Sequence, residues 1–149
     1  MKEWHAEIEI ATSAEGVWRV LADFPSYPQW NPLVTRVSGR PRIGERLKLR
    51  LEPPGTRGVP MRAKVITAEP NHELRWRGHL LSSRVLDGDH SFVIEPLEEN
   101  RVRFIQREVF RGLLVPLFAR TFARHAQQGY EEMNLALKQR CEASPAGGG

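Results

Sequence analysis

Apolar and polar residues alternate along much of this chain, which is the pattern of half-buried β-strands. Turn-forming residues separate the alternating segments, with clear signals at Pro70-Asn71, Asp87-Gly88 and Glu98-Glu99-Asn100. Short strands joined by tight turns are typical of an antiparallel meander. The expected strands cover residues 3–11, 33–38, 46–51, 61–67 and 73–78, and the two arms of a hairpin between residues 87 and 112.

Two short helices are expected between the first and the second strand. Ser13 is a suitable N-cap for the first helix. The buried stripe of that helix would consist of Val17, Trp18, Val20 and Leu21. The following segment, FPSYPQWNP, contains three prolines, each of which can begin a helical turn but cannot continue one. The second helix is therefore expected to cover only residues 26–30.

A long amphipathic helix is expected from Leu114 to about Arg140, because the apolar period changes there from two to between three and four. At 1.5 Å per residue such a helix is about 40 Å long, enough to cross a small sheet. Its apolar stripe contains Phe118, Phe122, Ala126, Gly129, Met133 and Leu137. A glycine inside a helix costs about 1 kcal/mol relative to alanine. Gly129 is therefore expected either to leave room for a ligand or for Trp76, or to allow a close contact between helix and strand.

The order of the elements indicates an α+β protein with a helix-grip fold. A twisted sheet that has a single amphipathic helix available can bury its apolar face only by curling around that helix. We therefore expect one domain over residues 1–141, in which a curved antiparallel sheet wraps around the C-terminal helix, and a disordered tail over residues 142–149. Such a packing is rarely filled completely, so a cavity is expected between sheet and helix.

The composition narrows the class of protein. With 149 residues, 40% hydrophobic and 27% charged, the chain is ordinary for a soluble globular domain. It has no apolar run of about 20 residues and no signal peptide, so integral membrane association is not expected. The single cysteine, Cys141, suits a cytoplasmic location. A net charge of +4 and a pI near 9.7 are too mild to indicate nucleic acid.

The hairpin between residues 87 and 112 carries polar residues on a face that should be apolar. Side chains two residues apart share a face of a strand, so Gln106 and Glu108 lie with Phe104. In the first arm His90 lies with Phe92. An unpaired buried polar group costs about 1–3 kcal/mol, so three such groups indicate a wetted or ligand-filled pocket. Surface positions near a sheet end, or a polar cluster that satisfies itself, are the alternatives.

Four segments, taken together, carry a resemblance to a known family: SAEGVWRVLADFPSYPQWNP, TRVSGRPRIGERLKL, DGDHSFVIEP and RFIQREVFRGLL. In these segments the chain resembles the START-like (SRPBCC) superfamily, in the branch of polyketide cyclases, dehydrases and lipid-transport proteins. The resemblance extends from the first strand to the end of the long helix. It implies a hydrophobic cavity that binds lipids, polyketides or other apolar molecules. It does not imply one reaction, because the superfamily includes enzymes, transfer proteins and chaperone activators.

A hydrophobic small molecule is therefore the expected partner, and neither a metal nor a cofactor is expected. The residues expected to contact it are Trp30, Trp76, His90, Phe92, Phe104, Gln106, Glu108, Phe110, Phe118, Phe122, Gly129, Tyr130 and Met133. Simple core packing is the alternative for each apolar member of this set. A histidine facing a carboxylate would also suit the acid–base chemistry of a cyclase or dehydrase, with His90 and Glu108 as the catalytic pair. A binding protein and an enzyme both remain open.

The opposite face of the meander is rich in cations, which gives a third hypothesis for function. Its basic residues are Arg46, Lys48, Arg50, Arg62, Lys64, Arg75 and Arg77. This face would attract an anionic membrane surface or an acidic protein. Nucleic acid is not expected, because no aromatic residues are interleaved for base stacking. A solvated face without a partner is the alternative, and an exposed edge strand would allow a homodimer.

Overall fold

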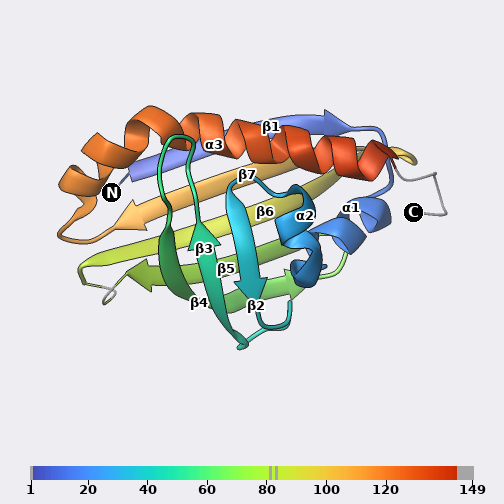
Figure 1. The fold of residues 1–149 in the computed structure, drawn as a ribbon. Coiled ribbons are helices and arrows are strands. Elements are labelled where there is room, and N and C mark those ends of the chain that lie inside the picture. Colours follow the sequence, from blue (N-terminus) through green and yellow to red (C-terminus); the bar gives the residue numbers. More distant parts are fainter. Residues whose placement is uncertain (1, 81, 83, 144–149) are drawn as a thin grey trace.

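One curved antiparallel sheet partly encloses a long C-terminal helix (Figure 1). The structure is a computed structural model that describes residues 2–80, 82 and 84–143, without the side chains of residues 80, 118, 119 and 121–124. Its elements are β1 (Lys2–Ile10), α1 (Ala14–Leu21), the 3-10 turn η1 (Phe24–Ser26), α2 (Tyr27–Trp30), β2 (Val34–Ser38), β3 (Arg46–Leu51), β4 (Val59–Glu69), β5 (Glu73–Leu80), β6 (Leu86–Glu98), β7 (Arg101–Arg111) and α3 (Val115–Ala143).

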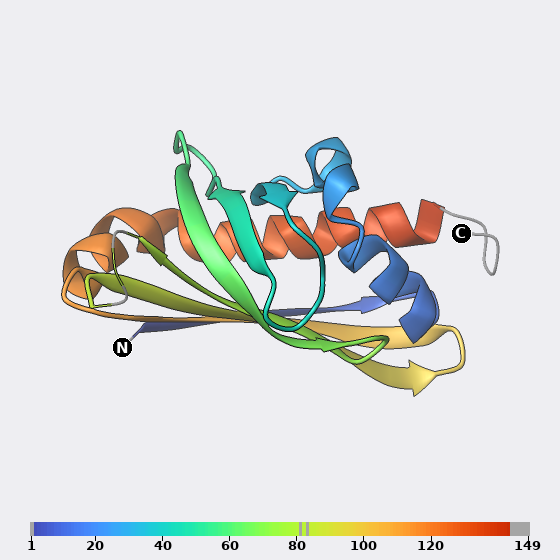
Figure 2. The ribbon, with the colours of Figure 1, turned by 90° about the horizontal axis from the view of Figure 1, so that it is seen from below.

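The predicted helix-grip fold is confirmed. The strand order across the sheet is β1-β7-β6-β5-β4-β3-β2, and all neighbouring strands are antiparallel. Figure 2 shows β3 and β4 rising out of the plane of the other strands toward the side on which α3 lies. The sheet therefore surrounds its apolar face on two sides, and α3 closes the space between them.

The two short helices form as expected from local hydrogen bonds. Ser13 caps α1, because its Oγ accepts from the Gly16 amide at 3.0 Å. The Tyr27 hydroxyl donates to the carbonyl of Leu21 at 2.5 Å, so the end of α1 is tied to α2. These contacts set the corner that leads the chain from β1 to β2.

The turn predicted at Asp87-Gly88 is wrong, because both residues lie inside β6. Gly88 pairs with Phe110 of β7, and a Cβ on Gly88 would lie only 2.8 Å from the Phe110 ring. Close packing, and not a turn, therefore requires the glycine. Asp87 forms an ion pair with Arg77 of β5 at 2.7 Å, which holds it in the strand.

Helix α3 lies along β1 and covers that edge of the sheet. The Gln127 side chain donates to the backbone carbonyl of His5 at 2.8 Å, and the Lys138 ammonium donates to the carbonyl of Glu9 at 3.1 Å. These bonds satisfy backbone groups that an edge strand would otherwise leave to solvent. The other edge strand, β2, is only five residues long.

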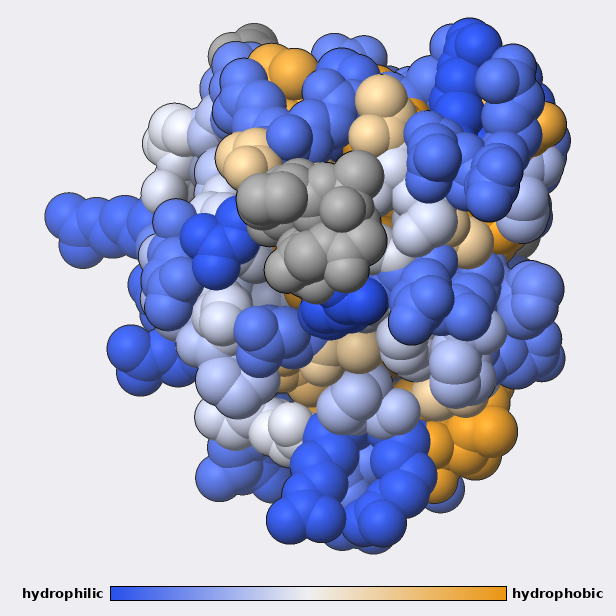
Figure 3. All heavy atoms as spheres, turned by 90° about the vertical axis from the view of Figure 1, so that its right-hand side faces the viewer, coloured by the Kyte–Doolittle hydropathy of each residue, from blue (hydrophilic) through white to orange (hydrophobic). Residues whose placement is uncertain are grey.

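The apolar stripe of α3 packs into the core. Its fully buried members include Ala126, Tyr130, Met133 and Leu137. The helix continues to Ala143, so the first two residues of the expected tail are helical, and residues 144–149 lie outside the described residues. Among the described helices, none combines the length and apolarity that a membrane span requires. From the end that carries α1, the surface is mainly hydrophilic, with apolar atoms in separate areas (Figure 3).

Candidate functional site

The strand register brings the three predicted polar residues together on the inner face of the sheet. His90 of β6 lies opposite Glu108 of β7 on one side and Trp76 of β5 on the other. Gln106 is two residues before Glu108 and therefore lies on the same face. His90 is 2%, Gln106 1% and Glu108 4% exposed, so all three are removed from water.

A chain of hydrogen bonds connects His90 to α3. His90 Nε2 lies 2.8 Å from Gln106 Oε1, and Gln106 Nε2 donates to Asn134 Oδ1 at 2.8 Å and to the Tyr130 carbonyl at 3.4 Å. A backbone carbonyl can only accept, so this contact supports the orientation in which Gln106 turns its oxygen to His90. In that orientation the neutral imidazole carries its proton on Nε2. Its other nitrogen, Nδ1, is then a free base that faces Glu108.

Two buried polar atoms in this region have no hydrogen-bond partner among the described residues. Glu108 Oε2 lies 3.6 Å from His90 Nδ1, which is too long for a hydrogen bond. The Tyr130 hydroxyl is the second unpaired atom. Its ring lies edge-on to His90 with 5.7 Å between the ring centroids. Unpaired buried groups of this kind carry a desolvation penalty that a ligand or water would relieve.

Burial favours the uncharged form of both members of the His90–Glu108 pair. Loss of solvent raises the pKa of Glu108 well above its usual value, and the carboxylates of Asp89 and Asp87 add to this effect. Loss of solvent also lowers the pKa of His90 to about 4, although the hydrogen bond with Gln106 partly opposes the change. Both shifts favour the uncharged forms, which are a carboxylic acid on Glu108 and an unprotonated imidazole nitrogen on His90.

A small hollow of about 10 Å³ lies next to this pair. Its walls are formed by Val34, Leu49, Leu51, Met61, Trp76, Gly78, Gly88, His90 and Glu108. Gly78 and Gly88 face each other across β5 and β6, so the two strands contribute no side chains at this position. The volume is close to what one water molecule needs. In this conformation the site is nearly closed.

Most of the aromatic residues expected to contact a ligand lie in the packed core. Phe92 stacks on His90 and on Phe104, with ring centroids 4.2 and 6.1 Å apart. Phe110 meets Trp4 edge-on at 5.5 Å. Phe92, Phe104, Phe110, Tyr130 and Met133 are buried and none of them borders the hollow. Their role as ligand contacts stays a prediction.

Of three further residues expected to contact a ligand, one lies away from the hollow and two have side chains outside the described residues. Trp30 of α2 is partly buried and packs edge-on against Tyr27 at 5.2 Å. The side chains of Phe118 and Phe122 are outside the described residues. Of the expected residues whose side chains are described, three border the hollow, namely Trp76, His90 and Glu108.

The packing around Gly129 supports the close-contact interpretation. A Cβ on Gly129 would lie 2.9 Å from Leu33 Cδ1 and 3.2 Å from Pro54 Cδ. The glycine therefore lets α3 approach the start of β2 and the loop between β3 and β4. Those side chains fill the space that a ligand or Trp76 was expected to occupy.

Two groups of residues at the site were not predicted from the sequence. The wall formed by Val34, Leu49, Leu51 and Met61 comes from β2, β3 and β4, whose apolar alternation was recognised but not connected with the polar hairpin. Asn134 lies four residues after Tyr130, so helical periodicity would have placed it on the inner face. Among the described residues, no three His, Cys, Asp or Glu side chains gather as metal ligands would.

Solved structures with the same fold include proteins of different kinds. The aromatase/cyclase ZhuI from Streptomyces sp. R1128 aligns with a TM-score of 0.76 and 17% identity over 95% of this chain and 93% of its own. A START superfamily protein from Mycobacterium smegmatis gives 0.74 and 23% over 95% and 97%. Norcoclaurine synthase from Thalictrum flavum gives 0.72 and 14% over 97% and 88%. At these identities the likeness establishes the fold alone.

Comparison with known sequences defines the family more closely. A search of curated proteins found no significant match. The family described as polyketide cyclase / dehydrase and lipid transport matches residues 1–142, which is nearly the whole chain. The fold, the element order and this match agree, and the chain therefore belongs to the polyketide cyclase/dehydrase and lipid-transport family of START-like proteins.

Proposed function

We propose that this protein binds a hydrophobic small molecule that carries a hydrogen-bond acceptor, in the space between the sheet and α3. The observation that carries the proposal is Glu108, a buried carboxyl group with an unpaired oxygen at the wall of an otherwise mainly apolar hollow. Membership of a family described by polyketide cyclases and lipid transport supports an apolar ligand.

The protonation states favour an acceptor on the ligand. Burial raises the pKa of Glu108, so its carboxyl group keeps a proton to donate. Burial also raises the pKa of Tyr130 well above its usual value, so its hydroxyl stays a donor. Glu108 Oε2 and the Tyr130 hydroxyl both lack a hydrogen-bond partner among the described residues. A ketone or ester oxygen on an apolar ligand would accept from either of them.

Ligand entry requires the hollow to widen. Leu49 and Met61 lie opposite each other on β3 and β4, border the hollow, and are 7% and 8% exposed. Methionine is unbranched and adapts readily to irregular spaces. Movement of these two side chains would enlarge the site from the β3–β4 side while the hydrogen-bonded chain on β6, β7 and α3 stays in place.

Binding of the neutral naphthyl ketone prodan tests this function. Glu108→Leu removes the donor but keeps a side chain of similar size, so we expect prodan affinity to fall by about 1–3 kcal/mol, or roughly 5–150-fold. Glu108→Gln keeps an N–H donor and should lose less. Glu95→Gln, at an exposed position on the same strand as His90, is the control. Circular dichroism and the melting temperature would show that each variant folds.

An unchanged affinity in Glu108→Leu would contradict the proposed contact. If none of a series of apolar ketones bound to the wild-type protein, this result would contradict the function itself. Native mass spectrometry of protein purified without added ligand is a complementary measurement, because a copurified molecule would identify the chemical class directly.

A second function, that of a cyclase or dehydrase, is favoured by the spacing of His90 and Glu108. Glu108 would donate its proton to a ligand carbonyl oxygen while His90 Nδ1 accepts the proton from the adjacent carbon, which gives an enol without net change of protons. The two groups are 3.6 Å apart, so one ligand would contact both. The lowered pKa of His90 makes it a weak base, which is the reason we place this function second.

Hydrogen–deuterium exchange separates an enzyme from a binding protein. If the pair catalyses enolisation, the wild-type protein should accelerate exchange of the methylene protons next to the prodan carbonyl in D₂O, followed by NMR. His90→Ala and Glu108→Gln should each lower that rate by about 10²–10⁴-fold. Exchange at the uncatalysed rate despite tight binding would leave ligand binding as the function.

A further inference from the structure

The outer face of the sheet divides into two halves of different electrostatic character. Over β1, β5, β6 and β7, five arginines are paired with carboxylates on neighbouring strands. These pairs are Arg107–Glu3 at 2.8 Å, Arg101–Glu9 at 2.8 Å, Arg103–Glu95 at 3.0 Å, Arg75–Asp89 at 2.5 Å and Arg77–Asp87 at 2.7 Å. Two of the basic residues expected to attract a partner, Arg75 and Arg77, are therefore neutralised within the sheet.

Cations face cations over β2, β3 and β4. The register places Arg36 opposite Arg50, Lys48 opposite Arg62, and Arg46 opposite Lys64. Of these six residues, only Arg50 has an ion pair among the described residues, with Glu52 at 3.4 Å. Like charges directly opposite in a sheet are destabilising. This half of the face therefore has an uncompensated positive charge, whereas carboxylates offset five arginines in the other half.

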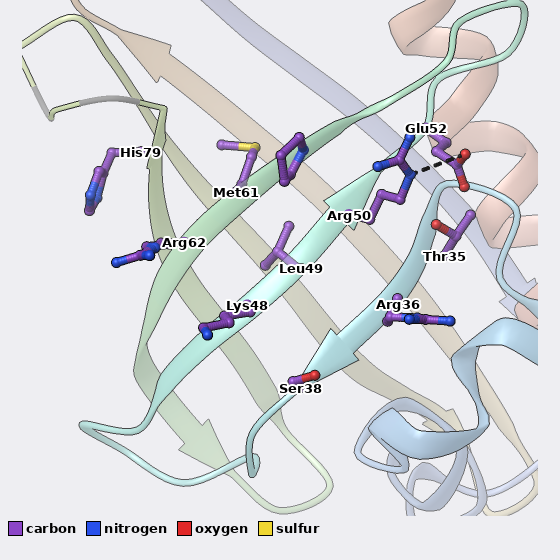
Figure 4. A pocket seen from close by; sticks show the side chains of 11 residues that line it. Thr35, Arg36, Ser38, Lys48, Leu49, Arg50, Glu52, Met61, Arg62 and His79 are labelled. Carbon is purple, nitrogen blue, oxygen red and sulfur yellow. Dashed lines mark ion pairs between the residues drawn. The ribbon is translucent and has the colours of Figure 1, made fainter.

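Four of these cations, Arg36, Lys48, Arg50 and Arg62, line a groove of about 1050 Å³ on the outside of the sheet, together with Glu52. Figure 4 shows Lys48 and Arg50 on β3, between Arg36 on β2 and Arg62 on β4. Thr35 and Ser38 add hydroxyl groups, and His79 of β5 lies at the far side, opposite Arg62. The volume is that of a small-molecule site and not of a gap between single side chains.

We propose that this groove binds a molecule that carries two or more phosphate groups. Arginine offers a planar fork of donors that matches phosphate oxygens, lysine adds a point charge, and the hydroxyls add further donors. A phosphate group carries about −1.5 to −2 charge near neutral pH, against −1 for a carboxylate. Phosphate groups therefore match the density of positive charge in the groove better than carboxylates do.

The register suggests how two phosphate groups would be held. One row of donors crosses the groove as Ser38, Lys48 and Arg62, followed by His79. Arg36 and Arg50 form the second row, which is displaced by two residues along β3. Two residues of a strand span about 7 Å. Each row can hold one phosphate group, and a ligand with a single anionic group would leave one row unneutralised.

The test compares two double variants that lower the net charge by the same amount. Lys48→Gln/Arg62→Gln removes two cations of the groove, whereas Arg101→Gln/Arg107→Gln removes two arginines from the paired half of the face. Binding of inorganic tripolyphosphate is measured by titration calorimetry at low salt. We expect at least about tenfold weaker binding for the groove variant and a small change for the control variant, with melting temperatures to verify folding.

Two further arms define the source of the phosphate groups. Cosedimentation with vesicles of cardiolipin, whose headgroup carries two phosphate groups, and phosphatidylcholine, against phosphatidylcholine alone, tests lipid headgroups. Tight binding of tripolyphosphate without vesicle binding supports a free phosphorylated ligand, and vesicle binding that only the groove variant loses supports a headgroup. Equal losses in both double variants would reduce the effect to net charge and overturn the proposal. Absence of both kinds of binding in the wild-type protein would also overturn it.

Discussion

At the scale of single residues, Glu108 determines the chemistry of the inner face. Its neighbours satisfy one another, since Gln106 bonds to His90 and to Asn134, while Glu108 Oε2 has no hydrogen-bond partner among the described residues. A charged carboxylate in that position would lose its hydration without gaining a donor. The neutral acid is therefore the form that the fold stabilises, and this form has a consequence for stability.

The free energy of unfolding should depend on pH through Glu108. The folded-state pKa of Glu108 is raised, so its contribution is fully present below the unfolded value of about 4.3 and is lost as pH rises toward the folded value. Glu108→Gln has no proton to lose. Relative to the wild type, its stability should therefore increase with pH above about 4.3, by up to about 1.4 kcal/mol per pH unit.

Urea unfolding between pH 5 and 8, at intervals of about one unit, measures this slope. The control is Glu3→Gln, because the hydrogen bond from Arg107 lowers the pKa of Glu3. Its difference from the wild type should stay constant between pH 5 and 8 and disappear only on the acid side, where the wild type loses stability as Glu3 is protonated. Parallel profiles for Glu108→Gln and the wild type would mean that Glu108 is ionised in the folded protein.

Strand periodicity was sufficient to predict which residues share the inner face, but it could not predict their partners. The alternation of Phe104, Gln106 and Glu108 is local, so it follows directly from the sequence. The bond from Gln106 to Asn134 joins residues 28 positions apart. It depends on how α3 packs against the sheet. Gly129 contributes to that packing through its close contacts with Leu33 and Pro54, which cannot be read from a local sequence pattern.

At the scale of elements, the same difficulty explains the error at Asp87-Gly88. An Asp-Gly pair is a strong local turn signal. Here the glycine is needed because the ring of Phe110, on the next strand, occupies the place of a side chain. The shape of the hollow was unpredictable for the same reason, since Val34, Leu49, Leu51 and Met61 in its wall come from β2, β3 and β4. A homodimer stays a prediction, with β2 as the edge that α3 leaves uncovered.

Charge repulsion between β3 and β4 should be measurable in the protein without ligand. Lys48→Glu replaces a like-charge pair with an opposite-charge pair, because Lys48 lies opposite Arg62. We expect the free energy of unfolding to rise by about 0.2–1 kcal/mol at low salt. The gain should shrink at about 1 M salt, where the Debye length is near 3 Å.

Chemical denaturation with urea, which adds no charge, is the suitable measurement. As a control, Arg101→Glu places a carboxylate beside Glu9 in the paired half of the face, so it should lower stability at low salt. A loss of stability in Lys48→Glu would show that the cations of β3 and β4 do not repel one another appreciably.

At the scale of the whole molecule, two sites share one wall. Leu49 and Met61 border both the inner hollow and the outer groove. The inner face is apolar except for its hydrogen-bonded chain and Glu108, and the outer face carries the unpaired cations. The sheet therefore separates two chemically distinct environments by the thickness of a single layer of strands.

If the protein binds an apolar ligand as proposed, the small size of the hollow should also limit how fast that ligand enters. A space of about 10 Å³ has no room for a molecule of several carbon atoms, so opening must precede binding. In stopped-flow mixing, the observed rate constant for an apolar ligand should rise with its concentration only until opening becomes limiting. Met61→Ala would remove part of the closed wall and should increase the limiting rate constant that is reached at high ligand concentration. In the wild-type protein, the rate of opening, and not the concentration of ligand, would then limit how fast a ligand binds and is released.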